Sequence, residues 1–194
     1  MRTSSTKTTD SRPAAVTAAV AVHTTPLGPL VLAATDEALV LCCFGPPEAA
    51  AERARRAGTH TVDEGEATAA QRRVLDEART QLDTYLSGGR RDFTVPMDLR
   101  LATPFSRRTV SALGEFVPYG RTATYARLAE ALDRPRAARA VGTALGANPL
   151  CVVLPCHRIV GSTGGLNGYA GGLEAKRFLL DLEAAALPVG RPSR

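Results

Sequence analysis

A cysteine and a histidine stand side by side inside an apolar stretch in the second half of the chain. The run 150–154, LCVVL, leads into Pro155, Cys156 and His157, and apolar residues resume at Ile159. A thiol becomes a nucleophile when it loses its proton, and a neighbouring imidazole favours that loss. Proline restricts the backbone and lacks a donor, so we expect the apolar run to end here in a turn. The pattern indicates a nucleophilic cysteine, although many buried cysteines are inert core residues.

A glycine-rich segment follows the Cys-His pair. Residues 161–172, GSTGGLNGYAGG, contain six glycines, which let a ligand or another backbone come close. The segment matches neither of the common glycine patterns that bind nucleotide phosphates, so nucleotide hydrolysis is not indicated. The helix expected over 173–184 carries Glu183 near its end. Glu183 is a candidate to orient the imidazole of His157, as the third member of a triad does, or else a solvated helix-end charge.

The cysteines and histidines give no pattern for a disulfide or a metal. The chain contains Cys42, Cys43, Cys151, Cys156, His23, His60 and His157. Neighbouring side chains on a strand point to opposite faces, so Cys42 and Cys43 cannot form an ordinary structural disulfide. No Cys-x-x-Cys pair is present. We therefore expect reduced thiols, no bound metal and no other cofactor.

Composition and charge place the chain among globular proteins with a basic second half. It has 194 residues, of which 44% are hydrophobic, and a net charge of +5. Residues 1–98 contain 11 Lys and Arg against 13 Asp and Glu, whereas residues 99–187 contain 11 against 6. The second half is therefore the expected face for a polyanion, although an ordinary basic surface is the alternative.

No segment has the apolar length of a signal peptide or a membrane span. We therefore expect a cytoplasmic protein with no membrane partner. A monomer is also expected. The Thr- and Ser-rich residues 1–15 and the last residues, 188–194, are expected to be tails outside the folded domains, the first of them disordered.

The first half is typical of strands followed by a helix. Residues 19–44 alternate short apolar runs with turn residues, which predicts a small antiparallel meander. Apolar spacing predicts a helix over 68–86, ended by a Ser-Gly-Gly sequence, and one more short strand over 93–97. This half shows no cluster of catalytic side chains.

The second half changes to short helices. The sequence predicts helices over 104–116, 124–132 and 136–145, separated by breaks at PYG and DRP. Two short helices joined by a tight turn fit a helix-turn-helix. Three ordinary core-packing helices are the alternative.

Three segments taken together, RAVGTALGANP, LPCHRIV and GYAGGLEAKRFLLDLE, closely resemble the O6-alkylguanine-DNA alkyltransferases, also called methylated-DNA–protein-cysteine methyltransferases. The resemblance is strong over 103–183 and looser in the first half, where TPLGPLVLAATD and QLDTYLSGGRRDF carry it. It implies an α+β fold. A ribonuclease-H-like sheet-plus-helix domain is expected over 16–98, and a helical, winged-helix or helix-turn-helix-like DNA-binding catalytic domain over 99–187.

The resemblance implies roles for the residues of the motif. Cys156 corresponds to the alkyl acceptor, and His157 and Glu183 correspond to the relay that keeps its sulfur anionic, through a water between Cys156 and His157. Tyr125 corresponds to the tyrosine that helps to rotate the target nucleotide and gives a proton toward the guanine. Arg139 corresponds to the arginine that takes the place of the extruded base.

The resemblance also implies a pocket and a DNA-binding helix. Asn148 joins the recognition helix to the active-site strand, Tyr169 lines the guanine pocket, and Arg158 and Val160 belong to the same pocket and hinge region. A helix that enters the narrow minor groove needs small side chains. The candidates for that surface are Ala137, Ala138, Ala140 and Gly142.

On this resemblance the protein repairs double-stranded DNA that contains alkylated guanine. The thiolate of Cys156 attacks the alkyl carbon, the bond to O6 breaks, and guanine leaves. Base flipping has to come first, because a paired guanine hides its O6 atom. The product is a thioether, which offers water no carbonyl to attack, so we expect one irreversible transfer per molecule. Activity on O4-alkylthymine stays open.

Two other functions are compatible with parts of this pattern: one would use Cys156 and His157, and the other would use the helix-turn-helix. A cysteine hydrolase needs an oxyanion hole and turns over repeatedly. A DNA-binding regulator reads the major groove with longer polar side chains and does not need Cys156. The family's binding-only relatives replace the acceptor cysteine, which this chain keeps. The chain departs from the common family pattern at Thr109, Val110 and Phe178, has no tryptophan and lacks a glycine in ATDEAL, but none of these departures touches the Cys-His-Arg motif.

Overall fold

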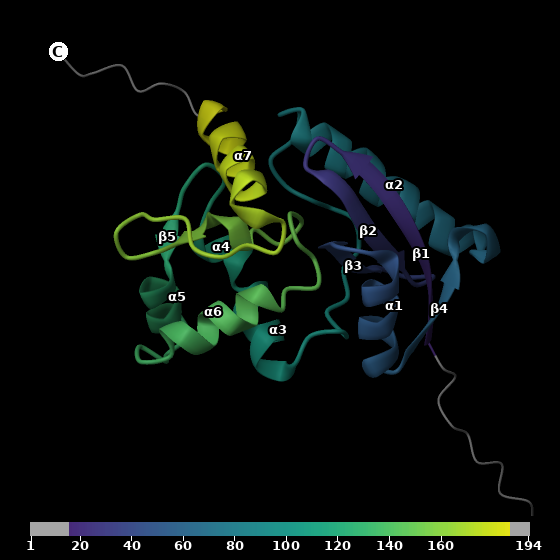
Figure 1. Cartoon of the computed structure of the whole chain (residues 1–194), viewed down its shortest axis with the longest axis horizontal. Coiled ribbons are helices and arrows are strands. Elements are labelled where there is room, and N and C mark those ends of the chain that lie inside the picture. The colour runs from purple at the N-terminus through teal and green to yellow at the C-terminus, as the bar shows by residue number, and fades with distance from the viewer. Residues whose placement is uncertain (1–15, 187–194) are drawn as a thin grey trace, which may run out of the picture.

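The computed structural model describes residues 16–186, so the tails expected at 1–15 and 188–194 lie outside the described residues. Figure 1 shows a sheet with its helices beside a second, mainly helical half. This arrangement is the α+β class that the sequence predicts. Within residues 16–186, no helix is both long enough and apolar enough to cross a membrane.

The first half contains a four-stranded sheet with the order β3-β2-β1-β4. Its strands are β1 (Val16–Thr25), β2 (Gly28–Ala34), β3 (Leu39–Phe44) and β4 (Thr59–Asp63). β2 pairs antiparallel with both β1 and β3, which confirms the predicted meander, whereas β4 pairs parallel with β1. The sequence did not predict β4.

Helices cover the two faces of this sheet (Figure 1). α2 (Ala69–Leu86) packs on the face that includes Leu30 and Leu32, and α1 (Pro47–Arg56) packs on the face that includes Val31. Successive strand residues therefore enter different hydrophobic clusters, as the two-residue repeat of a strand requires. Both faces are buried, so the sheet is a rigid support for the second half.

The predicted helix over 68–86 is present as α2, and its start has a clear local cause. The Thr68 hydroxyl accepts the N–H of Gln71 at 3.1 Å, while the Gln71 side chain accepts the N–H of Thr68 at 3.0 Å. This capping box satisfies two donors that a helix start leaves unpaired. The helix ends at Leu86, before Gly88 with φ of 80°.

Residues 93–97 do not form the strand that the sequence predicts. Met97 alone pairs, in one parallel bridge with Leu39 at the edge of β3. The N–H of Val95 instead donates to Oε1 of Gln81 at 3.2 Å. A side chain of α2 thus takes the place that a neighbouring strand would have.

The second half is built from short helices around a two-stranded pairing. Its elements are α3 (Pro104–Ser111), α4 (Leu113–Phe116), β5 (Ala123–Thr124), α5 (Tyr125–Ala131), α6 (Ala138–Gly146), β6 (Ile159–Val160) and α7 (Gly172–Ala185). The helix expected over 104–116 is therefore two helices that meet at Ala112. α5 and α6, joined by a short turn, form the predicted helix-turn-helix, and β5 pairs parallel with β6.

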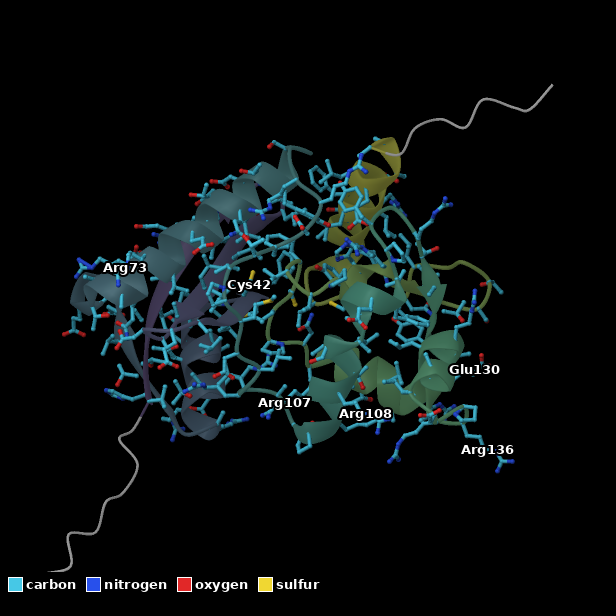
Figure 2. The ribbon with its side chains drawn as sticks, turned by 180° about the vertical axis from the view of Figure 1, so that it is seen from behind. Cys42, Arg73, Arg107, Arg108, Glu130 and Arg136 are labelled. Carbon is cyan, nitrogen blue, oxygen red and sulfur yellow. The ribbon has the colours of Figure 1, made fainter. Side chains whose placement is uncertain are left out.

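The two halves share a hydrogen-bonded junction at the edge of β3. Leu150 forms a parallel bridge with Cys42. The Cys42 N–H donates to the carbonyl of Pro149 at 2.8 Å, and the Cys151 N–H donates to the carbonyl of Cys42 at 2.7 Å. Figure 2 shows Cys42 at this junction. The segment that leads to Cys156 is thus fixed to the sheet of the first half.

Candidate active site

Cys156 lies in a tightly turned segment directly after this junction. The run 150–154 forms turns and no strand, and Cys156–Arg158 form a short 3₁₀ helix after Pro155. The turn predicted at Pro155 is therefore present, but Asn148 leads into turns and not into the active-site strand that the resemblance implies. Val152 has φ of 69°, a left-handed conformation that is rare for a β-branched residue. Cys156 is 7% exposed at the end of this segment.

Asn148 holds the turned segment together. Its Oδ1 atom accepts the N–H of Leu150 at 3.0 Å, and its Nδ2 atom lies 3.1 Å from the carbonyl oxygen of Leu154. The same Nδ2 atom lies 3.2 Å from the sulfur of Cys156. Asn148 is 2% exposed, so this amide connects the end of α6 to the sulfur inside the protein.

Hydrogen bonds and a nearby ammonium group favour the thiolate of Cys156. The largest effect that lowers its pKa is a hydrogen bond with the side chain of Cys151, and Asn148 and Lys176 lower it further. Burial acts in the opposite direction, but the net shift of the Cys156 pKa is downward. The sulfur is therefore a better nucleophile at neutral pH than an ordinary buried thiol.

Glu183, near the end of α7, is the centre of a buried polar network and not a solvated helix-end charge. Its carboxylate accepts Nε2–H of His157 at 2.6 Å, Nε–H of Arg158 at 2.9 Å and the backbone N–H of Gly120 at 2.8 Å. It also accepts the hydroxyl of Tyr85 from α2. His157 and Glu183 are 0% exposed, and Arg158 is 6% exposed. The network supports the role predicted for Glu183 in orienting the imidazole.

The network also fixes the protonation of His157. Burial opposes the charge of Glu183, but the hydrogen bonds from His157, Tyr85 and Gly120 lower its pKa to about 2. An ionised carboxylate only accepts hydrogen bonds, so the proton of His157 must be on Nε2. Burial lowers the pKa of His157, which keeps the ring neutral near pH 7. The buried Nδ1 atom has no hydrogen-bond partner among the described residues and carries a free lone pair.

An open cleft of about 650 Å³ lies over one face of α6. It is lined by Tyr125, Ala138, Arg139, Gly142, Gly146, Asn167, Gly168, Tyr169 and Ala170. Cys156 is not among these residues, but Tyr125 and Tyr169, which line the cleft, pack against the hydrophobic cluster that contains it. The cleft thus lies between the helix-turn-helix and the glycine-rich segment, and its two tyrosines connect it to the cluster of Cys156.

The ring of Tyr125 packs against Gly142 of α6. A Cβ atom at Gly142 would lie 3.7 Å from Cε1 of the Tyr125 ring, so the ring rests on this glycine. Burial raises the pKa of Tyr125, and the sulfur of Cys156 raises it further. The phenol therefore keeps its proton near neutral pH and is able to donate it.

The other site residues predicted from the sequence lie around the cleft or beneath it. Ala137 directly precedes α6 and forms no capping hydrogen bond with its side chain, and Ala140 is exposed on that helix. Val160, 6% exposed, is buried in β6 and, like Arg158, does not line the cleft. The structure thus joins His157 to Glu183 in a buried network that includes Arg158, and it places Tyr125, Tyr169 and the exposed face of α6 around the cleft.

Sequence reasoning missed three residues of the site. Tyr85 comes from the first half, and its place in α2 is that of an ordinary core aromatic residue. Cys151 was noted only as one of the four cysteines. Lys176 is 0% exposed, and its ammonium donates to the carbonyls of Ile159 at 2.6 Å and Asn167 at 3.0 Å. A lysine in an amphipathic helix usually signals a solvent-facing position, so no sequence pattern pointed to it.

The four cysteines are free thiols, as the sequence predicts. Cys42 and Cys43 lie in clusters on opposite faces of β3. Among residues 16–186, no three His, Cys, Asp or Glu side chains gather in a way that could hold a metal ion.

Two family models match this chain over most of its length. Residues 20–99 match the ribonuclease-like domain of 6-O-methylguanine DNA methyltransferase, and residues 104–185 match the DNA binding domain of the same family.

Named relatives agree with these models. A methylated-DNA–protein-cysteine methyltransferase of Methanosarcina acetivorans is 35% identical over 168 residues, which cover 85% of this chain and 97% of the relative. That of Mycobacterium tuberculosis is 40% identical over 164 residues, or 84% of this chain and 90% of the relative. An inducible enzyme of that name from Bacillus subtilis is 45% identical over 112 residues, or 58% of this chain and 62% of the relative.

Solved structures give the same result. The crystal structure of the Mycobacterium tuberculosis O6-methylguanine methyltransferase superposes with a TM-score of 0.69 at 34% identity, over 90% of this chain and 96% of that chain. The same values hold for a crystal structure of the Mycobacterium tuberculosis OGT in complex with DNA. With both domain models matched and relatives covered almost from end to end, the chain belongs to the 6-O-methylguanine DNA methyltransferase family.

Proposed function

We propose that Cys156 is the residue that accepts the alkyl group in the activity of this family. The protein is a methylated-DNA–protein-cysteine methyltransferase that acts in DNA repair. The observation that carries the proposal is the Cys156 sulfur itself, a free thiol with a lowered pKa in one cluster with Tyr125 and Tyr169, which line the cleft. The sulfur attacks the alkyl carbon on O6 of guanine, and the bond between that carbon and O6 breaks.

The relay that prepares the sulfur uses His157 and Glu183. His157 presents the lone pair of Nδ1, while Glu183 holds its Nε2–H at 2.6 Å. A water between Cys156 and Nδ1 would carry the thiol proton to the imidazole, and the carboxylate would stabilise the imidazolium. The leaving guanine needs a proton as the bond to O6 breaks, and the phenol of Tyr125 in the cleft is its donor.

The face of α6 around the cleft suits a minor groove and a flipped nucleotide. Ala138 and Gly142 keep this face shallow, and Arg139 projects from it as the long side chain that would replace an extruded base. Figure 2 shows the basic residues Arg107, Arg108 and Arg136 along one edge of the second half. Their charges supply contacts to phosphates.

We propose one irreversible transfer per molecule. The product is S-alkylcysteine, a thioether with no carbonyl carbon for water to attack, and the cleft offers no group that would remove the alkyl group. The free thiols fit a reducing compartment, and we place the protein in the cytoplasm on that ground.

The test is intact-protein mass spectrometry after incubation with excess duplex that contains O6-methylguanine, followed by peptide mapping. We expect one added methyl group per molecule on Cys156, and none in Cys156→Ser. Cys43→Ser is the matched control, because Cys43 lies on the other face of the sheet and its loss leaves the transfer unchanged. Repeated turnover without modification would indicate the hydrolase, and tight DNA binding without modification would indicate the regulator.

A further inference from the structure

The ring of Phe44, at the end of β3, lies against the glycine-rich segment that forms one wall of the cleft. Its centroid is 5.6 Å from that of Tyr169, and the two rings meet edge to face at 70°, an arrangement that aromatic pairs favour. Phe44 is not among the residues that line the cleft. We propose that Phe44 is a positioning residue, which fixes the Tyr169 ring so that the cleft is formed before a flipped base enters it. The inference rests on the proposed function only for the ligand of the cleft.

Gly171 shows how closely Phe44 approaches this segment. A Cβ atom at position 171 would lie 2.5 Å from Cζ of Phe44, and 2.6 and 2.7 Å from its two Cε atoms. Carbon atoms in van der Waals contact are about 3.5 to 4.0 Å apart, so the ring has room here only because residue 171 is a glycine. The Phe44 ring therefore rests on the backbone of the segment, two residues after Tyr169.

Packing holds the side chain of Tyr169, and hydrogen bonding does not. Its hydroxyl is buried and has no hydrogen-bond partner among the described residues. Residues 165–169 belong to no helix or strand, so the local backbone does not fix the ring either. Two other rings meet that of Tyr169 edge to face: Phe44 at 5.6 Å and His157 at 6.4 Å between centroids. Phe44 is the nearer of the two.

The sheet of the first half gives Phe44 a fixed base. Phe44 pairs with Leu30 of β2, and Cys42 lies two residues earlier on the same face of β3. Cys42 carries the hydrogen bonds of the junction between the two halves. One strand thus holds both the turns that lead to Cys156 and the segment that carries Tyr169.

A wall that is ordered before binding spares the ligand the cost of ordering it. Loss of the Phe44 ring should therefore weaken the capture of the base in the cleft. It should leave the chemistry at the sulfur of Cys156 unchanged, because Phe44 acts on the opposite wall through Tyr169.

The experiment compares Phe44→Leu and Phe44→Ala with the wild type in the full chain. Single-turnover methyl transfer is measured against the concentration of duplex that contains O6-methylguanine. We expect the half-saturating concentration to rise about fivefold in Phe44→Leu and at least as much in Phe44→Ala, with an unchanged maximal rate. Iodoacetamide modification of Cys156 should also be unchanged. Phe178→Leu, the same substitution at an exposed ring of α7, is the matched control.

Hydrogen exchange tests the same contact in the absence of DNA. The N–H of Gly172 donates to the carbonyl of Tyr169 at 2.9 Å, so its exchange reports on the order of the segment. We expect faster exchange over 165–172 in both Phe44 variants, and no change in α6. Gly171→Ala displaces the Phe44 ring and should have the same effect. The double variant with Phe44→Leu should then be no worse than the single variants.

Additive effects in the double variant would overturn the proposal, as would unchanged exchange over 165–172 or an unchanged half-saturating concentration. A parallel fall in the maximal rate and in iodoacetamide modification would also overturn it, because such a pattern indicates a general disturbance of the site. If Phe44→Ala unfolds, Phe44→Leu decides the question. A wild type that takes up no methyl group would refute the proposed function, while hydrogen exchange would still decide whether Phe44 positions Tyr169.

Discussion

The two sides of the active site differ in burial and in charge. The buried wall, made of Tyr85, His157, Arg158 and Glu183, is enclosed, and each of its side chains has a hydrogen-bond partner within the network. The open wall is made of Tyr125, Ala138, Arg139, Gly142 and Tyr169. Arg139 is exposed there and forms no ion pair with any residue from 16 to 186.

The difference separates the residues that hold the fold together around Cys156 from the residues that are accessible to a nucleic acid. The buried wall connects α7, α2 and the loop before β5, so its charges contribute to stability, and on the proposed function His157 and Glu183 also prepare the sulfur. The side chains of the open wall form no ionic network with the described residues, and Arg139 is exposed, so this wall is accessible to a nucleic acid that enters the cleft. Mutations in the buried wall should therefore change stability together with activity, whereas mutations in the open wall should change activity alone.

The largest effect is expected for Glu183→Gln. The change removes the charge that compensates Arg158, and an uncompensated buried charge costs about 3 to 5 kcal/mol of stability. His157 also loses its carboxylate partner, so the methyl-transfer rate should fall by more than about tenfold. Chemical denaturation and single-turnover transfer measure the two losses. Glu174→Gln, an exposed position on α7, is the control, and equal behaviour of the two variants would mean that the network contributes nothing.

A second effect concerns acid stability. The pKa of Glu183 falls from 4.5 to about 2 on folding, so the protein gains stability from it above the unfolded pKa. That contribution, about 3 kcal/mol, is lost as the pH falls from about 5 toward 2. Denaturation of the wild type and Glu183→Gln across this range should show the difference between them shrinking with falling pH. A difference that stays constant would show that Glu183 does not cause the acid sensitivity.

The sequence identified the motif residues, but it could not decide whether each of them is a functional residue or an ordinary structural one. Glu183 near a helix end is a solvated charge in most proteins, and its burial depends on α7 packing beside the Cys156–Arg158 turn. Tyr85 and Lys176 follow ordinary helix patterns, and their partners are distant in the sequence. The open wall was easier to predict, because Arg139 and Gly142 lie within one short helix.

In the first half, the clearest failures have local causes. α1 buries only Ala50 and Ala54, so its packing leaves no periodicity of large apolar residues for a sequence pattern to detect. β4, THTVD, contains a single valine and is recognisable only by its pairing with β1. The segment 93–97 has strand-like residues, but Gln81 of α2 accepts the N–H groups of Thr94 and Val95. Each outcome was decided by tertiary contacts that the local sequence does not contain.

The smallest of these effects, and the one that tests the open wall, is expected for Arg139→Ala. Base extrusion costs a few kcal/mol, and loss of the side chain that fills the gap should slow transfer from duplex DNA about 30-fold, or about 2 kcal/mol. Transfer from free O6-methylguanine needs no extrusion and should change little, and the stability of the protein should not change. Arg73→Ala, on the far side of the sheet half (Figure 2), is the matched control. Equal losses on duplex and free base, or a loss of stability, would place Arg139 in the same functional unit as the buried wall and remove the contrast between the two sides.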